Sequence, residues 1–452
     1  MSKSDFFILI SFIFLFSTWG ASAQTGKYVE SLKQASKQVE SKVIDWRRDF
    51  HEHPELSNRE FRTSEIVAAH LKSLGLDVTT GIAHTGVKAV LKGSSPGSVV
   101  ALRADMDALP IVERVDVPFA SKVTTNYNGA ETGVMHACGH DAHTAILMGI
   151  AEVLTDMKDQ LKGTVVFIFQ PAEEGAPFGE EGGAELMIKE GVLENPNVDV
   201  IFGLHMASAL EAGKIGYKPG PLLAGVSDFR IDVHGKGSHG STPWTSVDPI
   251  ATSAQIINSI QTIVSRNVNI TENPAVVTVG AIQGGNRSNI IPENVEMLGT
   301  IRVFSDQDEQ LVYDRLKLIS ENVATSAGAQ ATLTVPYSSH YPVTINDEEL
   351  AAEMLPTLQN TIGKENVQLM KAITGAEDFS FYAREIPGLF FFLGGMPPGQ
   401  DPAKATPHHT ADFYLDESGF VNGVQAMTNL VFDYMEMHPV SANGVQASPG
   451  SE

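Results

Sequence analysis

The sequence contains a single cysteine, Cys138, among its 452 residues, which excludes a disulfide framework within the chain. Cations are also scarce, since 31 Lys and Arg stand against 54 Asp and Glu and give a formal net charge of −23 at pH 7. Binding to phosphates needs clustered cations, so this balance argues against nucleic acid and against an anionic membrane surface as partners. Internal repeats and low-complexity segments are absent, and 42% of the residues are hydrophobic. The composition therefore predicts a soluble, acidic enzyme or binding protein.

The first 23 residues have the pattern of a secretory signal peptide. The apolar run Phe6–Phe16 follows Lys3 and precedes the small residues Ala21-Ser22-Ala23. The alternative is a membrane anchor, but this run is far shorter than the roughly 20 residues that span a bilayer. We therefore expect residues 1–23 to be removed by cleavage before Gln24, and the protein to be exported to the periplasm or outside the cell. Residues 439–452 are small, polar and aperiodic, and we expect a disordered tail.

Short, continuous apolar runs indicate a buried central sheet. Such runs are typical of strands that are covered on both faces, and they lie at Val99–Leu102, Val165–Phe169, Val200–Leu204 and Leu389–Leu393. Helical patterns alternate with them, which predicts an α/β domain with a largely central sheet. Two helices are expected before the first strand, one over Tyr28–Phe50 and one that starts with the capping box Ser57-x-x-Glu60.

The pattern changes between about Gly220 and Pro336. Phe229–Val233 and Val295–Val303 alternate between apolar and polar residues, as half-exposed strands do. Together with two helical patterns and two further strands they give the order β-α-β-β-α-β of ferredoxin-like domains. We therefore predict an inserted α+β satellite domain at residues 221–336, within a discontinuous catalytic domain at 24–220 and 337–438.

Chemically active side chains follow three of the buried strands. Asp105 and Asp107 come after the first, the pair Glu173-Glu174 after the second and His205 at the end of the third. Ligands of open α/β sheets bind beyond the carboxyl ends of the strands, so we expect these groups to meet at one edge. Further thiol and imidazole groups follow in the segments Met135–His143, which includes Cys138 and His140, and Pro407–Phe413, which includes His408 and His409.

Cys, His and Glu together are ligands of zinc and similar ions, and carboxylates also suit manganese. Ligands scattered from residue 138 to residue 409 are typical of a site that the fold assembles for catalysis, whereas structural zinc sites use closely spaced Cys and His. In the pair Glu173-Glu174, one carboxylate can hold metal while the other takes a proton from an activated water.

Each of these residues also has a purely structural interpretation. Cys138 is then a buried small side chain, and His136 and His143 are packing residues that support the site without binding metal. Asp141 caps the helix that follows it. Glu180-Glu181 is a solvated pair of loop charges. The structural interpretation must, however, account for Cys, His and Glu at several strand ends at once.

The motifs together resemble the N-acyl amino acid amidohydrolases. This group includes hippurate hydrolase and the plant indole-acetyl-amino-acid hydrolases, within the aminoacylase/carboxypeptidase G metallopeptidase family. The resemblance covers nearly all of the chain after the signal peptide and rests on Arg103–Pro110, Met135–His143, Pro171–Gly175, Gly203–His205, Gly235–His239, Asn289–Pro292, Gly299–Arg302, Gly375–Phe379 and His409.

The resemblance implies a two-metal catalytic domain of the exopeptidase type with an inserted lid domain that often forms a dimer. It implies Glu173 as general base and Asp107 as a supporting acidic residue, and it implies as metal ligands Cys138, His140, Glu174, His205 and His409. The family places the last His four residues before an aromatic residue, which favours His409 over His408. Two divalent ions per subunit are implied, zinc or manganese first and cobalt or nickel as alternatives. The stretch Ala176–Gly182 is longer than the corresponding loop of many relatives.

The implied substrate is an N-acyl amino acid or a short peptide with a free carboxylate. Asn289 and Arg302 are the candidates to bind that carboxylate, although Arg302 has an alternative role as an exposed, solubilising residue. His239 is implied to donate a hydrogen bond to the developing oxyanion, from the partner subunit in a homodimer, or else it is a turn residue. The alternative activities are a metallo-carboxypeptidase and a catalytically inactive binding relative.

Overall fold

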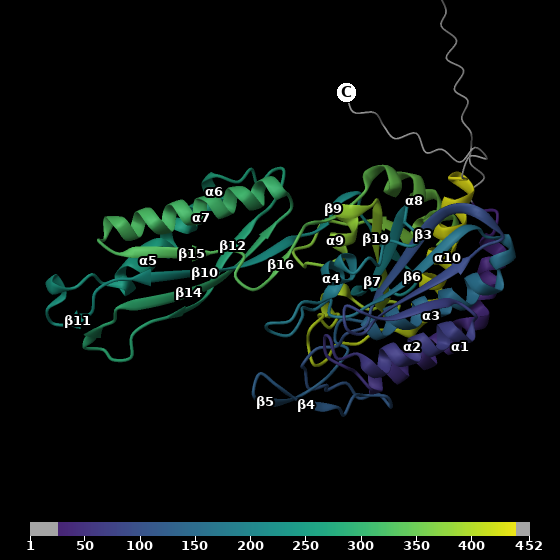
Figure 1. The fold of residues 1–452 in the computed structure, drawn as a ribbon, viewed down its shortest axis with the longest axis horizontal. Coiled ribbons are helices and arrows are strands. Elements are labelled where there is room, and N and C mark those ends of the chain that lie inside the picture. Colours follow the sequence, from purple (N-terminus) through teal and green to yellow (C-terminus); the bar gives the residue numbers. More distant parts are fainter. Residues whose placement is uncertain (1–25, 440–452) are drawn as a thin grey trace, which may run out of the picture.

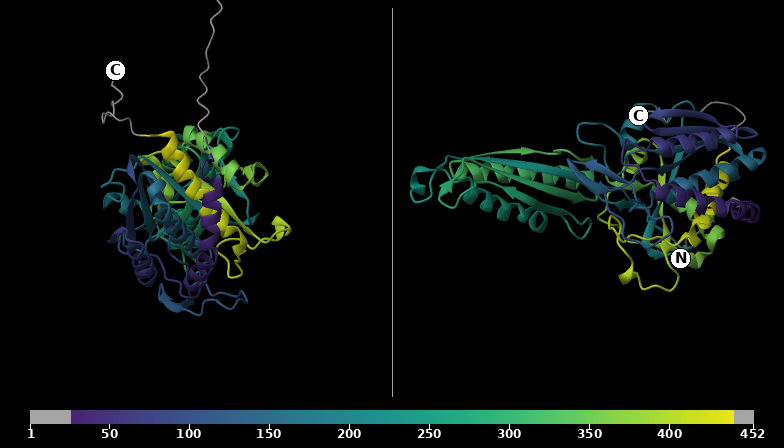
Figure 2. Two further views of the ribbon diagram at one scale, coloured as in Figure 1. Left: turned by 90° about the vertical axis from the view of Figure 1, so that its right-hand side faces the viewer. Right: turned by 90° about the horizontal axis from the view of Figure 1, so that it is seen from below.

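The computed structural model describes residues 26–439, so the predicted signal peptide and nearly all of the predicted tail lie outside the described residues. Within them the chain forms a large lobe built on an eight-stranded sheet and a narrow lobe that projects from it (Figures 1 and 2). Among residues 26–439, no helix has both the length and the apolar character needed to cross a membrane.

The sheet of the large lobe is mixed, and its four central strands are parallel. Its order is β1-β2-β6-β3-β7-β19-β8-β18, with β6, β3, β7 and β19 running in one direction. The four predicted strands lie in these four central strands, so the predicted α/β class with a central mixed sheet is confirmed. The strands of this sheet are β1 (Asp77–Ile82), β2 (Gly86–Lys92), β3 (Ser95–Asp105), β6 (Lys162–Gln170), β7 (Val200–Glu211), β8 (Ile215–Tyr217), β18 (Val367–Leu369) and β19 (Gly388–Met396).

Helices cover both faces of this sheet. Side chains of β6 alternate between two cores, with Phe167 on one face and Ile168 on the other. The first core is closed by α1 (Val29–Glu52), α2 (Phe61–Ser73), α3 (His140–Asp156), α8 (Glu348–Ile362) and α10 (Phe420–Met437). The second core is smaller and is closed by α4 (Gly183–Lys189) and α9 (Phe379–Glu385).

The predicted start of the second helix at Ser57 is wrong. Helix α2 begins at Phe61, and no side chain caps it from the N-cap position. The Glu55 carboxylate instead accepts hydrogen bonds from the backbone N–H groups of Arg62 and Thr63, at 3.0 and 2.8 Å. A carboxylate satisfies these otherwise unpaired groups as well as a capping box would. Ser57 and Glu60 are therefore free to make contacts outside the helix.

The narrow lobe has an antiparallel sheet of its own, with helices on one face (Figure 1). Its strand order is β12-β14-β10-β15, and β16 pairs with the start of β10. The elements follow the predicted β-α-β-β-α-β order. They are β10 (Gly225–His234), α5 (Pro249–Ile260), α6 (Thr262–Arg266), β12 (Val276–Gln283), β14 (Asn294–Val303), α7 (Asp306–Ser326), β15 (Gln330–Thr334) and β16 (His340–Tyr341).

Short strand pairs lie outside the two sheets. The chain enters the narrow lobe after β9 (Gly220–Leu223) and leaves it before β17 (Thr344–Asn346), and these two strands pair with each other. At the far end of the narrow lobe, β11 (Ser238–His239) pairs with β13 (Ile290–Ile291) (Figure 1). A hairpin of β4 (Thr124–Tyr127) and β5 (Ala130–Gly133) extends from the large lobe. The domain boundaries at residues 220 and 336 stay a prediction.

Candidate active site

The carboxyl ends of the parallel strands bring the predicted ligands together. β3 ends at Asp105, β6 ends just before the Glu173-Glu174 pair, and His205 lies in the neighbouring strand β7. Cys138 and His140 join them because α3 begins at His140, with Gly139 in a left-handed conformation (φ 107°) at its N-cap. The fold therefore places the thiol, imidazole and carboxylate groups at one edge of the sheet, as its topology predicts.

The five predicted ligands form one cluster. The Cys138 sulfur lies 3.4 Å from His205 Nε2 and 3.3 Å from His409 Nε2. Glu174 Oε1 lies 3.0 Å from His409 Nε2 and 3.9 Å from His140 Nε2. In the region that the structure describes, five groups of three residues have donor atoms close enough together to hold an ion, and two of these groups are made of predicted ligands alone. Both of the two contain Cys138, so its sulfur lies between two candidate metal positions. The two groups are Cys138, His140, His205 and Cys138, Glu174, His409.

These residues fit divalent ions. Ligands at about 2.0–2.3 Å from one tetrahedral ion are about 3.4 Å apart, close to the separations between the donors here. His140 Nε2 is buried and has no hydrogen-bond partner among residues 26–439. Burial would lower the pKa of His140, but Asp105 and Asp107 raise it to about 10. The cluster therefore has a surplus of negative charge that a bound cation would neutralise.

Hydrogen bonds orient the two buried imidazoles. His140 Nδ1 lies 3.2 Å from Asp107 Oδ1, and His205 Nδ1 donates to the Met206 carbonyl at 2.7 Å. Each contact leaves Nε2 directed at the cluster, which is how metal-binding histidines are commonly held. Asp107 also accepts hydrogen bonds from the backbone N–H groups of Glu173 and Glu174, both at 3.0 Å. The geometry thus gives Asp107 a supporting position.

Of the two neighbouring histidines, His409 lies closer to the ligands. His408 Nε2 accepts a hydrogen bond from the Ser208 N–H at 3.2 Å, and its ring packs against Phe413. Its Nδ1 lies 3.7 Å from the Cys138 sulfur, farther than His409 Nε2. His409 adopts a left-handed backbone (φ 60°), which turns its side chain towards Glu174. This geometry favours His409 as the last ligand.

Glu173 lies among other acidic groups. Burial raises the pKa of Glu173 well above its usual value, and Glu377, Glu174 and Asp378 raise it further. The counter-charge is Arg103, whose buried guanidinium donates to Asp105 and Asp378 at 2.7 Å each. The sequence analysis assigned no role to Arg103, Glu377 or Asp378. The sequence did contain a signal that these residues matter, since all three lie in motifs that carry the family resemblance.

Several residues with structural interpretations are now placed. His143 Nδ1 lies 2.6 Å from Asp105, and its Nε2 accepts a hydrogen bond from the Met206 N–H. Asp141 does not cap α3, so that interpretation is wrong; it is buried inside the first turn against Arg47 and His51.

Glu180 and Glu181 are exposed loop residues, as the structural interpretation expects. Glu180 also pairs with the Arg59 guanidinium and with Asn58 Nδ2, with N–O distances between 2.5 and 3.1 Å.

A cavity of about 700 Å³ opens over the cluster. Arg302 of β14 lines it and has no ion-pair partner among residues 26–439. Tyr341 of β16 also lines it, and its hydroxyl donates to the Glu173 carbonyl at 2.8 Å. The rest of the wall is mainly apolar and includes Leu223, Val226, Met370, Ile373 and Phe392.

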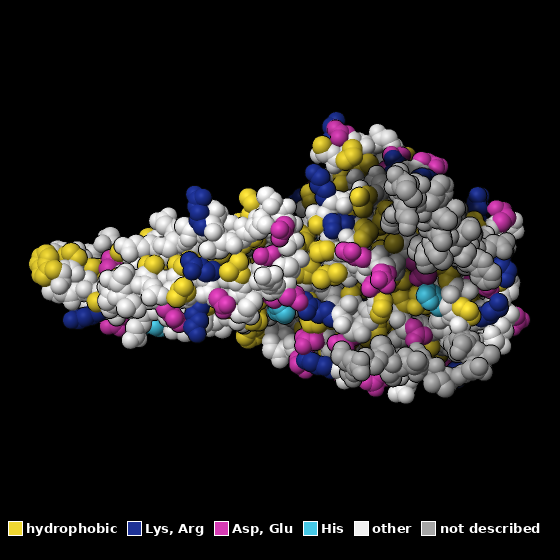
Figure 3. Space-filling view, turned by 90° about the horizontal axis from the view of Figure 1, so that it is seen from above, with side chains coloured by type: hydrophobic (Ala, Val, Ile, Leu, Met, Phe, Trp, Pro, Cys, Tyr) yellow, Lys and Arg dark blue, Asp and Glu magenta, His cyan; other side chains and the backbone are white. Residues whose placement is uncertain are grey.

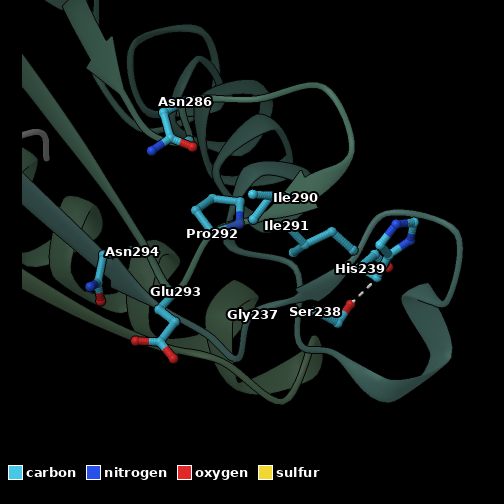
Figure 4. Close-up of a pocket in the computed structure, with 10 residues that line it drawn as sticks. Gly237, Ser238, His239, Asn286, Ile290, Ile291, Pro292, Glu293 and Asn294 are labelled. Carbon is cyan, nitrogen blue, oxygen red and sulfur yellow. Dashed lines mark hydrogen bonds between the residues drawn. The ribbon is translucent and has the colours of Figure 1, made fainter.

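Two predicted residues lie elsewhere. His239 belongs to β11 at the far end of the narrow lobe, and Asn289 is paired with the same segment through a hydrogen bond from the Gly240 N–H. His239 lines a separate cavity of about 760 Å³, together with Ser238, Asn286 and Ile290 (Figure 4). Within one chain, the structure brings Arg302 to the cluster but not His239 or Asn289.

An α/β sheet whose parallel strands end in a cluster of thiol, imidazole and carboxylate donors under a substrate-sized cavity defines a metal-dependent hydrolase. Residues 101–433 match the family described as peptidase family M20/M25/M40, and the chain belongs to this family. It is thus a metal-dependent enzyme that hydrolyses linear amide or peptide bonds.

Three similar proteins illustrate the range of the family. The chain is 39% identical to thermostable carboxypeptidase 2 of Saccharolobus solfataricus, over 90% of this chain and 98% of that protein. It is also 39% identical to N-acetylcysteine deacetylase of Bacillus subtilis, over 89% and 99%. The crystal structure of the Bacillus subtilis YXEP protein, described as a dinuclear metal binding peptidase from the M20 family, matches with a TM-score of 0.74 and 36% identity, over 88% and 99%.

Proposed function

We propose that this enzyme cleaves the amide bond of N-acyl amino acids, with Glu173 as the general base. The observation that carries this proposal is the cavity itself, in which Arg302, a cation with no ion-pair partner in the described part of the chain, faces the same space as the ligand cluster. An anionic group bound at Arg302 would leave the amide of an amino acid close to the cluster. The apolar wall would accept an acyl group or an apolar side chain.

The mechanism follows from the surroundings of each residue. Divalent ions held by the five ligands would supply a water of lowered pKa and polarise the amide carbonyl. The Glu173 carboxylate takes the proton from the attacking water and passes it to the leaving nitrogen. Asp107 and Tyr341 hold the backbone of Glu173 through its N–H and its carbonyl, so the base keeps a fixed position.

We assign the remaining predicted residues to a homodimer. His239 and Asn289 lie at the end of the narrow lobe and would reach a cluster only in a second subunit. Figure 3 shows hydrophobic side chains gathered at this end of the lobe. Exposed apolar residues of this region include Trp244 and Ile290, at 78% and 46% exposure. In a dimer, His239 would donate to the oxyanion and Asn289 would contact the substrate.

The physiological metal and the location of the enzyme belong to the same proposal. Mixed sulfur, nitrogen and oxygen donors favour zinc or manganese, with cobalt or nickel as alternatives. The signal pattern in residues 1–23 favours export to the periplasm or outside the cell.

The test is a substrate panel with the purified, mature enzyme loaded with Zn²⁺, Mn²⁺, Co²⁺ or Ni²⁺. Acetyl- and benzoyl-amino acids should be cleaved faster than dipeptides of matched side chain. Faster cleavage of dipeptides would establish the carboxypeptidase instead, for which the similarity to thermostable carboxypeptidase 2 is the argument. No turnover with any metal would favour a binding relative, although the ligand cluster and Glu173 are intact.

A further inference from the structure

Glu60 is a fully buried carboxylate that contacts the segment carrying Glu173. Its Oε1 accepts hydrogen bonds from the backbone N–H groups of Ala172 and Asn58, both at 3.0 Å. Its Oε2 accepts one from the Thr85 hydroxyl at 2.6 Å. The Glu60 side chain does not cap α2, so its hydrogen bonds to Ala172, Asn58 and Thr85 account for its buried position. A buried polar group is retained only where its hydrogen bonds are made.

The backbone that Glu60 holds has an unusual conformation. Ala172 has φ 54°, in the left-handed region that alanine rarely adopts. Such residues persist where the surroundings fix them, and they concentrate at functional sites. The next two N–H groups, of Glu173 and Glu174, both donate to Asp107. Three consecutive N–H groups before and at the acidic pair are thus held by two buried carboxylates, those of Glu60 and Asp107.

The neighbours of Glu60 hold the other end of the same segment. Asn58 Nδ2 donates to the Glu181 carbonyl at 3.0 Å and to the Glu180 carboxylate at 3.1 Å. The Arg59 guanidinium also pairs with Glu180. Residues 58–60 therefore fix both ends of residues 172–181.

We propose that Glu60 is a positioning residue of the active site, whose carboxylate holds the Ala172 turn and thereby sets where Glu173 and Glu174 point. The inference rests on the proposed function only in the roles of those two residues. Glu60 itself touches neither the predicted ligands nor the cavity. Its loss should disturb both the geometry of the base and the metal ligand beside it.

The first test is Glu60→Ala. The Ala172 N–H would then be buried without a partner, and the turn would relax. A displacement of about 1 Å at a reacting group can lower the rate about 100-fold. We expect kcat to fall by roughly 10- to 100-fold with KM nearly unchanged. The absorption spectrum of the Co²⁺-loaded protein should change, and Co²⁺ should be lost to a chelator faster than from the wild type.

The conservative variant Glu60→Gln should rescue these properties. Burial, together with the nearby Asp107, raises the pKa of Glu60 to about 8, so a neutral side chain of the same shape is a close substitute. The amide oxygen can accept from Ala172, and the amide nitrogen can donate to the Thr85 hydroxyl. We expect Glu60→Gln to keep most of the activity and a Co²⁺ spectrum close to that of the wild type.

Glu55→Ala is the matched control. Glu55 lies in the same segment and caps α2, but it does not contact residues 172–181. It should lower the melting temperature while kcat and the Co²⁺ spectrum stay as in the wild type. The inference is overturned if Glu60→Ala keeps the wild-type kcat and spectrum, or if Glu55→Ala changes both to the same extent.

A milder variant covers the case in which Glu60→Ala does not fold. Glu60→Asp shortens the side chain by one methylene group and draws its carboxylate away from the Ala172 N–H, so a partial loss of kcat with an altered Co²⁺ spectrum is expected. Wild-type kcat and spectrum in Glu60→Asp would overturn the inference. If the wild type cleaves no amide, the proposed function fails, but the Co²⁺ spectrum and metal retention of the variants still decide the role of Glu60.

Discussion

Glu173 and Glu174 are adjacent in sequence but face different neighbours. Both lie near His140 Nε2, at 3.7 and 3.9 Å, but Glu174 approaches His409 at 3.0 Å, whereas Glu173 lies near Glu377 and Asp378. Burial and these carboxylates raise the pKa of Glu173, and a carboxylate of raised pKa is a stronger base near neutral pH. These surroundings favour Glu174 as the ligand and Glu173 as the base, the assignment that the family resemblance implies.

Glu173→Gln tests this separation. The amide has nearly the same size but cannot take a proton, so kcat should fall by about 10²–10⁴-fold, the usual contribution of a general base. Metal content, measured after gel filtration, should equal that of the wild type. Glu174→Gln is the matched comparison and should lose metal. An active, metal-loaded Glu173→Gln enzyme would refute the role of Glu173.

His408 and His409 should differ in the same assay. His409→Ala removes a nitrogen that lies 3.0 Å from Glu174 and 3.3 Å from Cys138, so about one metal ion per subunit should be lost. His408→Ala removes an acceptor for the Ser208 N–H and a packed ring, and should mainly lower stability. Metal analysis of both variants decides the assignment, and loss of metal only from His408→Ala would reverse it.

The strands of the large sheet were predictable because their environment is uniform. β6 places Phe167 in one core and Ile168 in the other, so every residue of the run is apolar and the signal is local. The start of α2 at Phe61 was not predictable. The same polar side chains can cap a helix or hydrogen-bond to another segment, depending on where the helix begins. Only the tertiary structure shows that the Ser57 hydroxyl donates to Asp107.

The candidate site shows the same limit. Ligands placed directly after buried strands could be predicted from the topology and from motif spacing. The pairing of Arg103 with Asp378 could not, since the two residues are 275 positions apart and nothing local indicates the contact. Charge compensation in a buried network depends on long-range contacts, which a single sequence does not contain.

The connection from β15 to β16 depends on one carboxylate of β10. Asp228 accepts hydrogen bonds from the N–H groups of residues 337–339, at 2.8–3.2 Å, and from the Ser338 hydroxyl. Burial alone would raise the pKa of Asp228, but these hydrogen bonds lower it below its usual value. A carboxylate of lowered pKa stabilises the fold above its unfolded pKa of about 3.9, and that contribution is lost as the pH falls through the folded pKa.

Asp228→Ala should therefore destabilise the protein by about 1–2 kcal/mol at pH 7, in urea unfolding followed by fluorescence. The difference from the wild type should begin to shrink as the pH falls below about 3.9, and it should be smallest below the lowered folded pKa of Asp228, where the wild-type carboxyl is neutral too. Asp232→Ala, on the same strand, removes a partly exposed ion pair with Arg230 and should change stability by less than about 1 kcal/mol. A difference at Asp228 that is constant with pH would contradict the assignment.

The narrow lobe places two predicted substrate contacts at opposite ends. Arg302 lies at its base, in the cavity over the ligand cluster, whereas β11 with His239 lies at its far end (Figure 1). His239 Nδ1 is hydrogen-bonded to Ser241 in the same turn, and its ring is exposed. If His239 takes part in catalysis, it does so in another subunit, because its own cluster is at the other end of the molecule.

Subunit mixing tests this requirement. His239→Ala should lower kcat by about 10²–10³-fold, the usual effect of losing one oxyanion donor, with KM and metal content nearly unchanged.

The Glu173→Gln variant is inactive for a different reason, which makes it the partner for mixing. In a mixed dimer, the His239→Ala subunit keeps its base and receives the intact His239 of the Glu173→Gln subunit, so one of the two sites is complete. Mixing the two inactive variants should restore activity to at most about half per mixed dimer, in proportion to the mixed dimers counted by native mass spectrometry. Subunit exchange without recovered activity would rule out donation across the interface, and a fully active His239→Ala enzyme would remove His239 from the mechanism.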